Sequence, residues 1–296
     1  MRINSQDRDA HILKKIIITG DDFGLAVPVN EAIVEAHVYG ALTTASLMVG
    51  AGSAPDAVNK AKALPSLKVG LHIVLVEGNS ILPPDAIPDL VNSRGEFSTH
   101  LVKAGFKYFF YPGIRKQLEA EIRAQFKKFQ DTGLPLDHVN AHNHMHLHPT
   151  ILRLIVKVGK EFGLKAVRLP NEPPIRSWKA LEKGLASRVL SWIFLYPWLA
   201  VMKRVLRQAH IRYNDFLFGM ADSGAMSLDL VLRFIQNLPP GVTELHFHPA
   251  TRRCREIDET MPGYVHEDEY RTLTSRQLVK TLQDTGIRKI AFSDLD

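Results

Sequence analysis

Short apolar runs alternate with amphipathic segments along most of this chain. Apolar runs that predict strands lie at 15–19, 43–49, 69–76, 165–169, 215–219, 242–248 and 289–292, and residues 137–147 predict a strand running into a loop. Helical periodicity covers residues 28–40, 54–64, 114–132, 150–162 and 275–285. Polar residues follow the carboxyl ends of the strands. This pattern predicts an α/β fold, a (β/α) barrel whose active site gathers at that face.

Two stretches interrupt the alternation. Residues 83–113 are long and contain prolines, so we expect a loop over the active face. Residues 176–212 form a basic, apolar insertion, in which 189–202 is apolar at all positions but Ser191 and Pro197. As a helix this run reaches about 21 Å, which is short of the ~30 Å hydrocarbon core of a bilayer. We therefore do not expect it to span a membrane.

The apolar run in the insertion leaves two interpretations open. It is either a buried helix, helical hairpin or dimer contact, or an interfacial segment that lies on a membrane. The second interpretation makes 189–207 an anionic-membrane surface, because aromatic rings suit the headgroup level and cations suit anionic lipid. The residues of these two kinds are Trp192, Tyr196, Trp198, Lys203, Arg204 and Arg207.

Composition limits the classes of protein to consider. The 296 residues are 45% apolar, and we predict a leader at 1–14 followed by a single domain at 15–296. The single cysteine excludes an intramolecular disulfide, and the leader lacks the apolar core of a signal peptide, so we expect a cytoplasmic protein. Residues 176–212 carry eight Lys or Arg and one acid, net +7, whereas the whole chain is +6 and the rest is therefore −1. Such local basicity argues against nucleic acid and for a local anionic partner.

Histidines are concentrated in residues 137–149. Five of the thirteen histidines lie there, at positions 138, 142, 144, 146 and 148. Strand side chains alternate between faces, so His142, His144 and His146 would share one side at intervals of about 6.6 Å. One metal ion could then bind one of them easily, but hardly all three. Because imidazole binds zinc and titrates near neutral pH, this stretch predicts a functional site rather than a surface histidine run.

Acidic residues and further histidines belong to other strands. Asp21 and Asp22 follow the first strand, and adjacent carboxylates repel each other unless a positive charge lies between them. A metal ion could take one carboxylate and leave the other as a base; the alternative is a loop in which one Asp caps the next helix. His72, inside the apolar third strand, is either a core residue or a third ligand. One face of the 242–248 strand carries three titratable residues, Glu244, His246 and His248.

Four motifs in this order resemble those of the YdjC-like carbohydrate deacetylases. They are Thr-Gly-Asp-Asp-Phe-Gly at 19–24, Val-Gly-Leu-His at 69–72, Asn-Ala-His-Asn-His-Met-His-Leu-His-Pro at 140–149 and Leu-His-Phe-His-Pro at 245–249. The resemblance runs from about residue 15 to the C-terminus. Residues 20–50 and the histidine stretch are also similar to the hopanoid-biosynthesis-associated branch, called HpnK. That similarity implies a hopanoid glycolipid substrate, N-acetylglucosaminyl bacteriohopanetetrol.

The resemblance also implies a fold and roles for individual residues. The fold is an irregular, TIM-barrel-like (β/α) barrel, and the cofactor is one divalent metal ion, magnesium or zinc. Asp22, His72 and His142 are implied as the metal ligands. Asp21 is implied as the general base and His248 as the candidate general acid. Four further residues are expected either to support these groups or to contact the substrate: His144, His146, His246 and Arg168.

These residues favour hydrolysis of an N-acetyl group on an amino sugar. Asp21 would deprotonate a water molecule, and a histidine that titrates near pH 7, His248, would protonate the leaving amine. Deacetylation of soluble N-acetylated oligosaccharides is an alternative. So is a metal-dependent phosphoester hydrolase, but the sequence shows no Gly-rich phosphate loop and no second full metal set. A non-catalytic lipid-binding protein is a further alternative. Asp21 argues against it, because such a protein has no need of a free carboxylate beside a metal ligand. Expected partners are an amino-sugar glycolipid, an anionic surface at the inner membrane face and a second copy of the chain.

Overall fold

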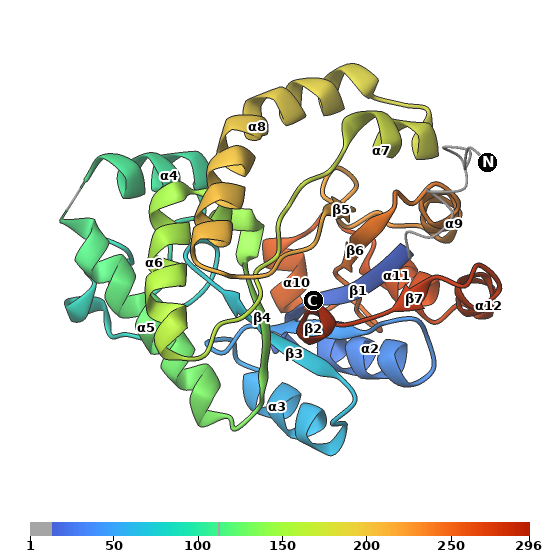
Figure 1. The fold of residues 1–296 in the computed structure, drawn as a ribbon. Coiled ribbons are helices and arrows are strands. Elements are labelled where there is room, and N and C mark those ends of the chain that lie inside the picture. The colour runs from blue at the N-terminus through green and yellow to red at the C-terminus, as the bar shows by residue number, and fades with distance from the viewer. Residues whose placement is uncertain (1–13, 112) are drawn as a thin grey trace.

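A computed structural model describes residues 14–111 and 113–296, and its centre is a parallel sheet (Figure 1). The strands are β1 (Lys14–Phe23), β2 (Thr44–Leu47), β3 (Lys68–Ile73), β4 (Leu136–Ala141), β5 (Phe216–Phe218), β6 (Gly241–Phe247) and β7 (Arg288–Lys289). Their order is β4-β3-β2-β1-β6-β5, with β7 paired to β1. All these pairs are parallel. The leader predicted at 1–14 falls outside the described residues except for Lys14, which belongs to β1, and the single domain stays a prediction.

The gap between β4 and β5 is filled by residues 165–171, which include the strand predicted at 165–169. These residues form single bridges rather than a regular strand. On one side their backbone is hydrogen-bonded to Val139 of β4, and on the other to Arg212 and to Leu217 of β5. The predicted irregular (β/α) barrel-like fold is therefore confirmed, with its irregularity located between β4 and β5.

The alternation of side chains along β1 builds two apolar layers. Ile16 and Ile18 are fully buried in the main core, which lies between the sheet and the helices. Ile17 points to the other face and packs with Phe292 and Leu295 in a small second cluster. A run of β-branched residues with both faces covered is typical of a parallel sheet.

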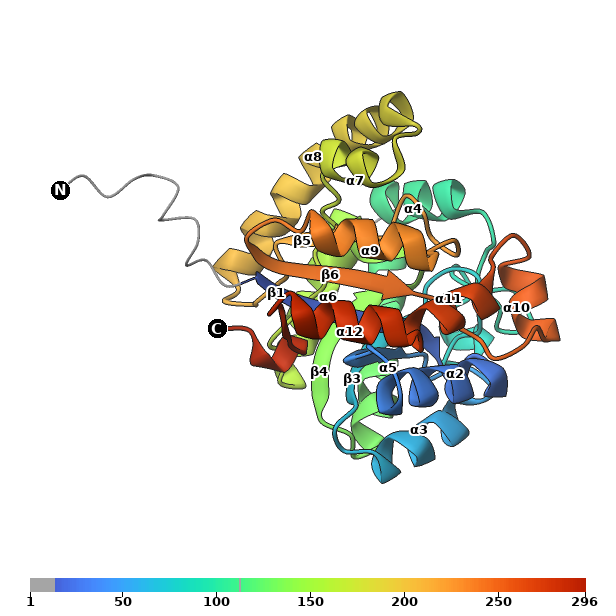
Figure 2. The ribbon, with the colours of Figure 1, turned by 90° about the vertical axis from the view of Figure 1, so that its right-hand side faces the viewer.

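Helices cover the outside of the sheet (Figure 2). They are α2 (Val27–Val38), α3 (Ala54–Ala63), α5 (Ile114–Asp131), α6 (Pro149–Glu161), α9 (Leu228–Gln236), α10 (Arg255–Thr260), α11 (His266–Leu273) and α12 (Arg276–Asp284). Most are amphipathic, as their sequences predict. In α6, for example, Ile151, Leu152 and Ile155 are buried while Arg153 is exposed.

Two further predicted elements differ from the structure. The loop expected at 83–113 contains a short 3-10 turn, η1 (Pro84–Ala86), and a helix, α4 (Leu101–Phe110). Helix α4 buries only Ala104 and Tyr108 and exposes apolar residues elsewhere, so its sequence lacks the polar face by which a surface helix is recognised. The closing strand predicted at 289–292 shrinks to β7. Phe292–Asp294 forms a 3-10 turn, η3, because backbone N–H groups of Phe292 and Ser293 donate to the Asp137 carboxylate.

The insertion at 176–212 forms two helices, α7 (Pro174–Leu181) and α8 (Leu185–Gln208). Figure 1 shows α8 changing direction along its length, and Pro197 lies in its middle. Its C-terminal half packs on the barrel through Leu199, Met202 and Leu206, whereas its N-terminal half is largely exposed. By length and composition alone α8 is apolar enough to cross a membrane, and only 11% of its apolar window is buried.

Candidate active site

The predicted site residues meet at the carboxyl ends of the strands. Asp21 and Asp22 come from the end of β1, His72 from β3, and His246 and His248 from β6 and the residues after it. His142 begins the 3-10 turn η2 (His142–Leu147), which follows β4. A cavity of about 170 Å³ opens there, lined by Asp21, His72, His142, His144, His246, His248, Met220, Ser223, Met261 and Tyr264 among others.

Asp22, His72 and His142 form a group that fits a divalent metal ion. Asp22 Oδ1 lies 3.2 Å from His72 Nε2 and 3.2 Å from His142 Nδ1. Neighbouring ligands of a tetrahedral zinc ion are about 3.3 Å apart, given bonds of about 2.0–2.1 Å. Asp22 Oδ2 and His72 Nε2 are buried without a hydrogen-bond partner among the described residues. These two atoms keep free lone pairs, and the 3.2 Å spacing of the group is suited to binding a cation between them.

The neighbours of His72 orient its ring for metal binding. Its Nδ1 lies 2.7 Å from Asn140 Oδ1, an acceptor, so Nδ1 carries the proton and Nε2 keeps a free lone pair. The Asn140 amide nitrogen in turn donates to Ser46 Oγ and Asp21 Oδ1. On the other ligand, His142 Nε2 lies 3.8 Å from a Glu77 carboxylate oxygen. Both imidazoles therefore have a polar group on the side away from Asp22.

The backbone around the group is strained. The described residues include six non-glycine residues in the left-handed region, and four of them surround this site: Asp22, Glu77, Asn143 and His144, with φ between 50° and 61°. Such conformations cost of order 1–3 kcal/mol each and cluster at functional sites. Because β4 ends at Ala141 and η2 turns away, the expectation that His142, His144 and His146 share one strand face is wrong.

The other predicted histidines have separate places. His144 and His246 line the cavity with their rings 5.3 Å apart, and Nδ1 of each has no partner among the described residues. His146 lies beneath the cavity and is fully buried. Its Nδ1 accepts from the Ala141 backbone N–H, and its Nε2 donates to the Arg168 carbonyl. His146 therefore supports the turn and has no free nitrogen for a ligand.

A second group with the same residue types lies beside the first. Asp21, His246 and His248 also bring potential ligand atoms within 4.8 Å of one another. From the sequence we expected no second full set of metal ligands. As far as the types of residue are concerned, this expectation is wrong. Asp21 differs from Asp22, however, because its two oxygens accept from Arg168 Nη1 at 2.5 Å and Nη2 at 3.0 Å.

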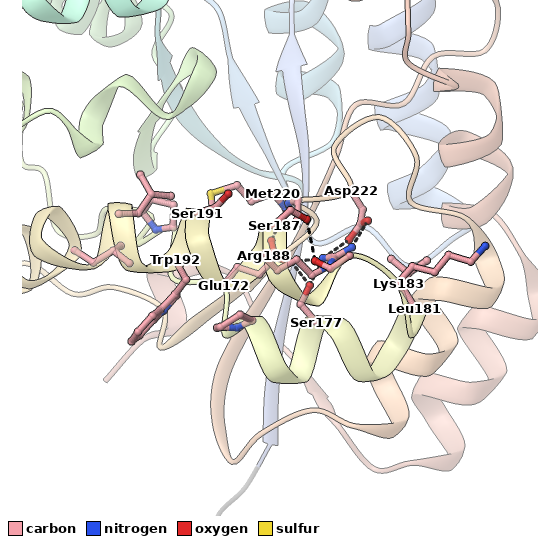
Figure 3. A pocket seen from close by; sticks show the side chains of 16 residues that line it. Glu172, Ser177, Leu181, Lys183, Ser187, Arg188, Ser191, Trp192, Met220 and Asp222 are labelled. Atoms are coloured by element: carbon pink, nitrogen blue, oxygen red, sulfur yellow. Dashed lines mark hydrogen bonds and ion pairs between the residues drawn. The ribbon is translucent and has the colours of Figure 1, made fainter.

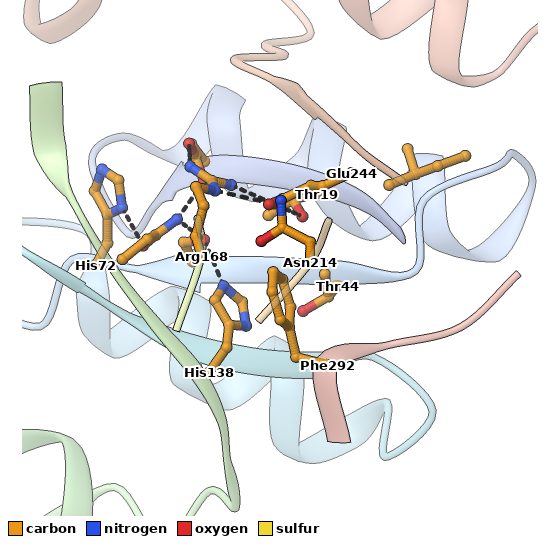
Figure 4. A network of polar contacts seen from close by, with 12 residues as sticks. Thr19, Thr44, His72, His138, Arg168, Asn214, Glu244 and Phe292 are labelled. Carbon is orange, nitrogen blue, oxygen red and sulfur yellow. Dashed lines mark hydrogen bonds and ion pairs between the residues drawn. The ribbon is translucent and has the colours of Figure 1, made fainter. Parts of the chain in front are cut away.

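Arg168 joins Asp21 to a second carboxylate, that of Glu244. Figure 4 shows the polar contacts between Arg168 and Glu244. Its Nε and Nη2 donate to Glu244 Oε1 at 3.0 and 2.7 Å, and Thr19 Oγ1 donates to the same oxygen at 2.6 Å. Asp21, Asp22, Glu244 and Arg168 are all at least 98% buried. Two carboxylates, those of Asp21 and Glu244, thus share one guanidinium, and the Asp22 carboxylate beside them contacts two histidines instead. This excess of buried negative charge favours a bound cation.

The pKa values of these groups follow from that charge. Burial would raise the pKa of both aspartates, but Arg168 and His72 hold the pKa of Asp21 well below its usual range, and His142 and His72 do the same for Asp22. Burial lowers the pKa of His142, but the Asp22 carboxylate reverses this and leaves it raised. Burial lowers the pKa of His248 to about 4 despite the nearby Asp22 and Asp21.

Three supporting residues had no predicted role. Asn140 and Glu77 could have been found by the rule that located Asp21, since both lie at or just after the carboxyl end of a strand. Glu269 lies on α11 and gives no sequence signal. Its carboxylate accepts from the backbone N–H groups of Met226 and His248, and burial raises its pKa to about 7.

A larger cavity of about 530 Å³ lies between α7, α8 and residues 220–222 (Figure 3). Met220 lines both this cavity and the one that holds the histidines. Its apolar walls come from Leu181, Trp192, Leu195, Leu199 and the prolines at 170 and 174. At one side Arg188 pairs with Asp222 and the buried Glu172, whose other oxygen accepts from two backbone N–H groups, those of Met220 and Ala221.

Known proteins are similar to this chain in sequence and in fold. The model of the YdjC-like protein family matches residues 15–284. A carbohydrate deacetylase of Vibrio cholerae is 36% identical over 95% of this chain and 96% of its own length, and one of Brevibacillus brevis is 28% identical over 95% and 99%. A proposed cellobiose-phosphate cleavage protein of Enterococcus faecalis superposes with a TM-score of 0.73 at 22% identity, covering 95% of this chain and 98% of that one. At that identity the last likeness shows the fold alone.

Proposed function

We propose that this chain, which belongs to the YdjC-like family and is a carbohydrate deacetylase, removes the acetyl group in a metal-dependent hydrolysis. The observation that carries the proposal is the difference between two neighbouring aspartates. Asp22 has an oxygen with no partner beside two histidines, whereas Asp21 is held by Arg168. One carboxylate is thus free to bind a metal ion, and the other is oriented for proton transfer.

The chemistry divides among the ligands and two further residues. Asp22, His72 and His142 would hold a divalent ion, zinc or magnesium, which supplies Lewis-acid polarisation of the acetyl carbonyl. Asp21 is ionised at neutral pH, because Arg168 lowers its pKa, and a carboxylate, with about four lone-pair sites, retains one after the three hydrogen bonds from Arg168 and Asn140. It can therefore accept a proton from the attacking water. Arg168 fixes the orientation of the Asp21 carboxylate.

His248 is the residue we assign to protonation of the leaving amine. With a pKa of about 4 it is neutral at pH 7, so the expected titration near pH 7 does not hold for the protein without metal or substrate. Negative charge that builds on the substrate oxygen raises the pKa of a nearby histidine. We therefore propose that His248 takes up a proton from solvent as this charge builds and passes it to the leaving amine, while Asp21 returns the proton of the attacking water to solvent.

For the substrate, we propose an N-acetylglucosamine-type sugar carried by an apolar body, such as N-acetylglucosaminyl bacteriohopanetetrol. The support is the larger cavity, which has apolar walls and shares the lining residue Met220 with the histidine cavity. A sugar at Asp21 could extend its aglycone into this space. Soluble N-acetylated oligosaccharides would leave these walls in contact with water.

The experiment is an assay of the metal-loaded protein on matched substrates. An N-acetylglucosaminyl lipid and a short soluble N-acetylglucosaminide are compared by acetate release and by mass spectrometry, in which one acetyl group is exchanged for hydrogen. We expect acetate from both and a higher kcat/KM for the lipid. Equal kcat/KM values would remove the lipid proposal, and no acetate from any N-acetyl sugar would remove the deacetylase.

A second candidate is a two-metal phosphoester hydrolase, because two metal-ligand groups lie side by side. Arg168 argues against it, since a guanidinium already neutralises Asp21. Phosphate release from a sugar phosphate in the same assay distinguishes the two activities.

A further inference from the structure

Exposed apolar side chains gather on one part of the molecule. Among the described residues, eleven of the fifteen large apolar residues that are exposed belong to α4 and the residue after it, α7 and α8. We define the apolar face as the surface formed by three residues of α4 and three of α8, namely Val102, Phe106, Phe110, Leu190, Ile193 and Phe194. These side chains are 57% to 87% exposed. Such a concentration marks an interaction site rather than scattered surface residues.

The two halves of the apolar face are connected. The ring of Phe109 on α4 lies 6.5 Å from that of Trp198 on α8. Phe109 also lies 5.8 Å from the ring of His148, which follows the turn η2. The apolar face is therefore joined to the segment that carries His142. In Figure 2, α4, α7 and α8 lie together in the upper part of the molecule.

We propose that the apolar face docks on an anionic lipid bilayer and inserts its side chains at the headgroup boundary. This goes beyond the deacetylase function and does not depend on it. The evidence for this partner is charge. Neither α4 nor α8 contains an acidic residue, and both carry cations, such as Lys103 on α4 and Arg204 on α8. Apolar residues flanked by cations are what an anionic membrane surface binds.

Two other occupants fit less well. In a symmetric dimer the apolar face would meet a copy of itself and bring its cations together, which repel. A membrane span would need about 20 apolar residues, but the C-terminal half of α8 is fixed in the core by Leu199, Met202 and Leu206. The free residues, 185–198, reach about 21 Å as a helix.

The three aromatic residues expected at the headgroup level differ in position. Tyr196 is exposed, Trp198 contacts Phe109, and Trp192 lines the larger cavity together with Leu195. Helix α8 therefore contributes side chains both to the apolar face and to the larger cavity, which shares the lining residue Met220 with the histidine cavity. Docking would bring this cavity to the lipid surface, at the inner membrane leaflet, where anionic lipids are concentrated.

The test is co-sedimentation of the full chain with vesicles of phosphatidylcholine alone or with phosphatidylglycerol added. We expect binding to the anionic vesicles that weakens in high salt. Phe106→Ser with Phe194→Ser should weaken it about tenfold or more. The matched control is Val38→Ser with Tyr39→Ser, which removes exposed apolar side chains from α2 and its end, away from the apolar face.

Two further readouts keep the outcomes distinct. Acetate release from a soluble N-acetylglucosaminide should be the same in the wild type and both double variants, which shows that the fold is intact. Absence of vesicle binding by the wild type, or equal binding by the two double variants, overturns the proposal. A concentration-dependent dimer that only Phe106→Ser with Phe194→Ser abolishes also overturns it, in favour of a second copy. A protein that binds vesicles but releases no acetate keeps this proposal and loses the deacetylase.

Discussion

The two Asp-His-His groups of this protein have the same residue types and opposite surroundings. In the first, Asp22 Oδ2 and His72 Nε2 have no hydrogen-bond partner among the described residues. In the second, both oxygens of Asp21 accept hydrogen bonds from Arg168. A guanidinium already supplies the positive charge that a metal ion would bring to Asp21. The comparison teaches that the neighbours of a ligand set, rather than its composition, decide whether it binds a metal.

Removing a ligand of the first group should have the largest effect. Alanine at Asp22, His72 or His142 would delete a direct bond to the ion that we propose, so we expect the bound metal to be lost and activity to fall on the order of 10³-fold or more. Metal content by mass spectrometry and acetate release measure the two losses. His144→Ala is the matched control, since His144 lines the same cavity outside the group. Full metal occupancy in His142→Ala would contradict the assignment and point to His144.

Asp21→Asn tests the second group. This change removes the proton acceptor but keeps the shape of the side chain, so kcat should fall about 10²–10⁴-fold while the metal is retained. Activity and metal content are measured on the same preparation. If metal is lost together with activity, Asp21 is itself a ligand and the two groups act as one site.

Arg168→Met should make the two groups more alike. Loss of the guanidinium leaves Asp21 and Glu244 buried without their partner, which should lower the free energy of unfolding by about 3–5 kcal/mol. It also frees Asp21, so with excess zinc the stoichiometry should rise from one ion per chain toward two. Urea unfolding and metal titration measure these changes, with Arg168→Lys as the milder variant. A stoichiometry that stays at one would show that the second group cannot bind metal even when free.

The smallest expected effect concerns pH. A histidine whose pKa is lowered by folding binds fewer protons in the native state, so the metal-free protein should lose stability as pH falls from about 6.5 toward the pKa of His248, about 4. His248→Asn should make this dependence shallower by up to about 1.4 kcal/mol per pH unit. Urea unfolding between pH 7 and pH 4.5 in chelator provides the measurement. The exposed His210, changed to Asn, is the control, and an equal change in both variants would contradict the assignment.

Part of this structure could be predicted because strand patterns place residues at the carboxyl edge of a sheet. That rule located Asp21, Asp22 and His72 before any contact was known. Arg168 was expected as a supporting residue, but its pairing with Asp21 could not be predicted, since the two are 147 residues apart in sequence. The turn η2 was missed because alternating histidines and apolar residues suit a strand, and the left-handed conformation at Asn143 and His144 leaves no mark on that alternation. Helix α4 was missed because its apolar residues face solvent.

The central position of β1 has a consequence for synthesis of the protein. Its neighbour β6 pairs Lys14 with Gly241, so one edge of the first strand has no partner until more than two hundred further residues have been made. At roughly 5–20 residues per second this takes about 10–45 s. Throughout that time the run Ile16–Ile18, fully buried in the finished fold, is open to other chains. From the synthesis of β1 onward the nascent chain therefore carries an aggregation-prone segment, and its yield in a cell depends on how well that segment is shielded before β6 emerges.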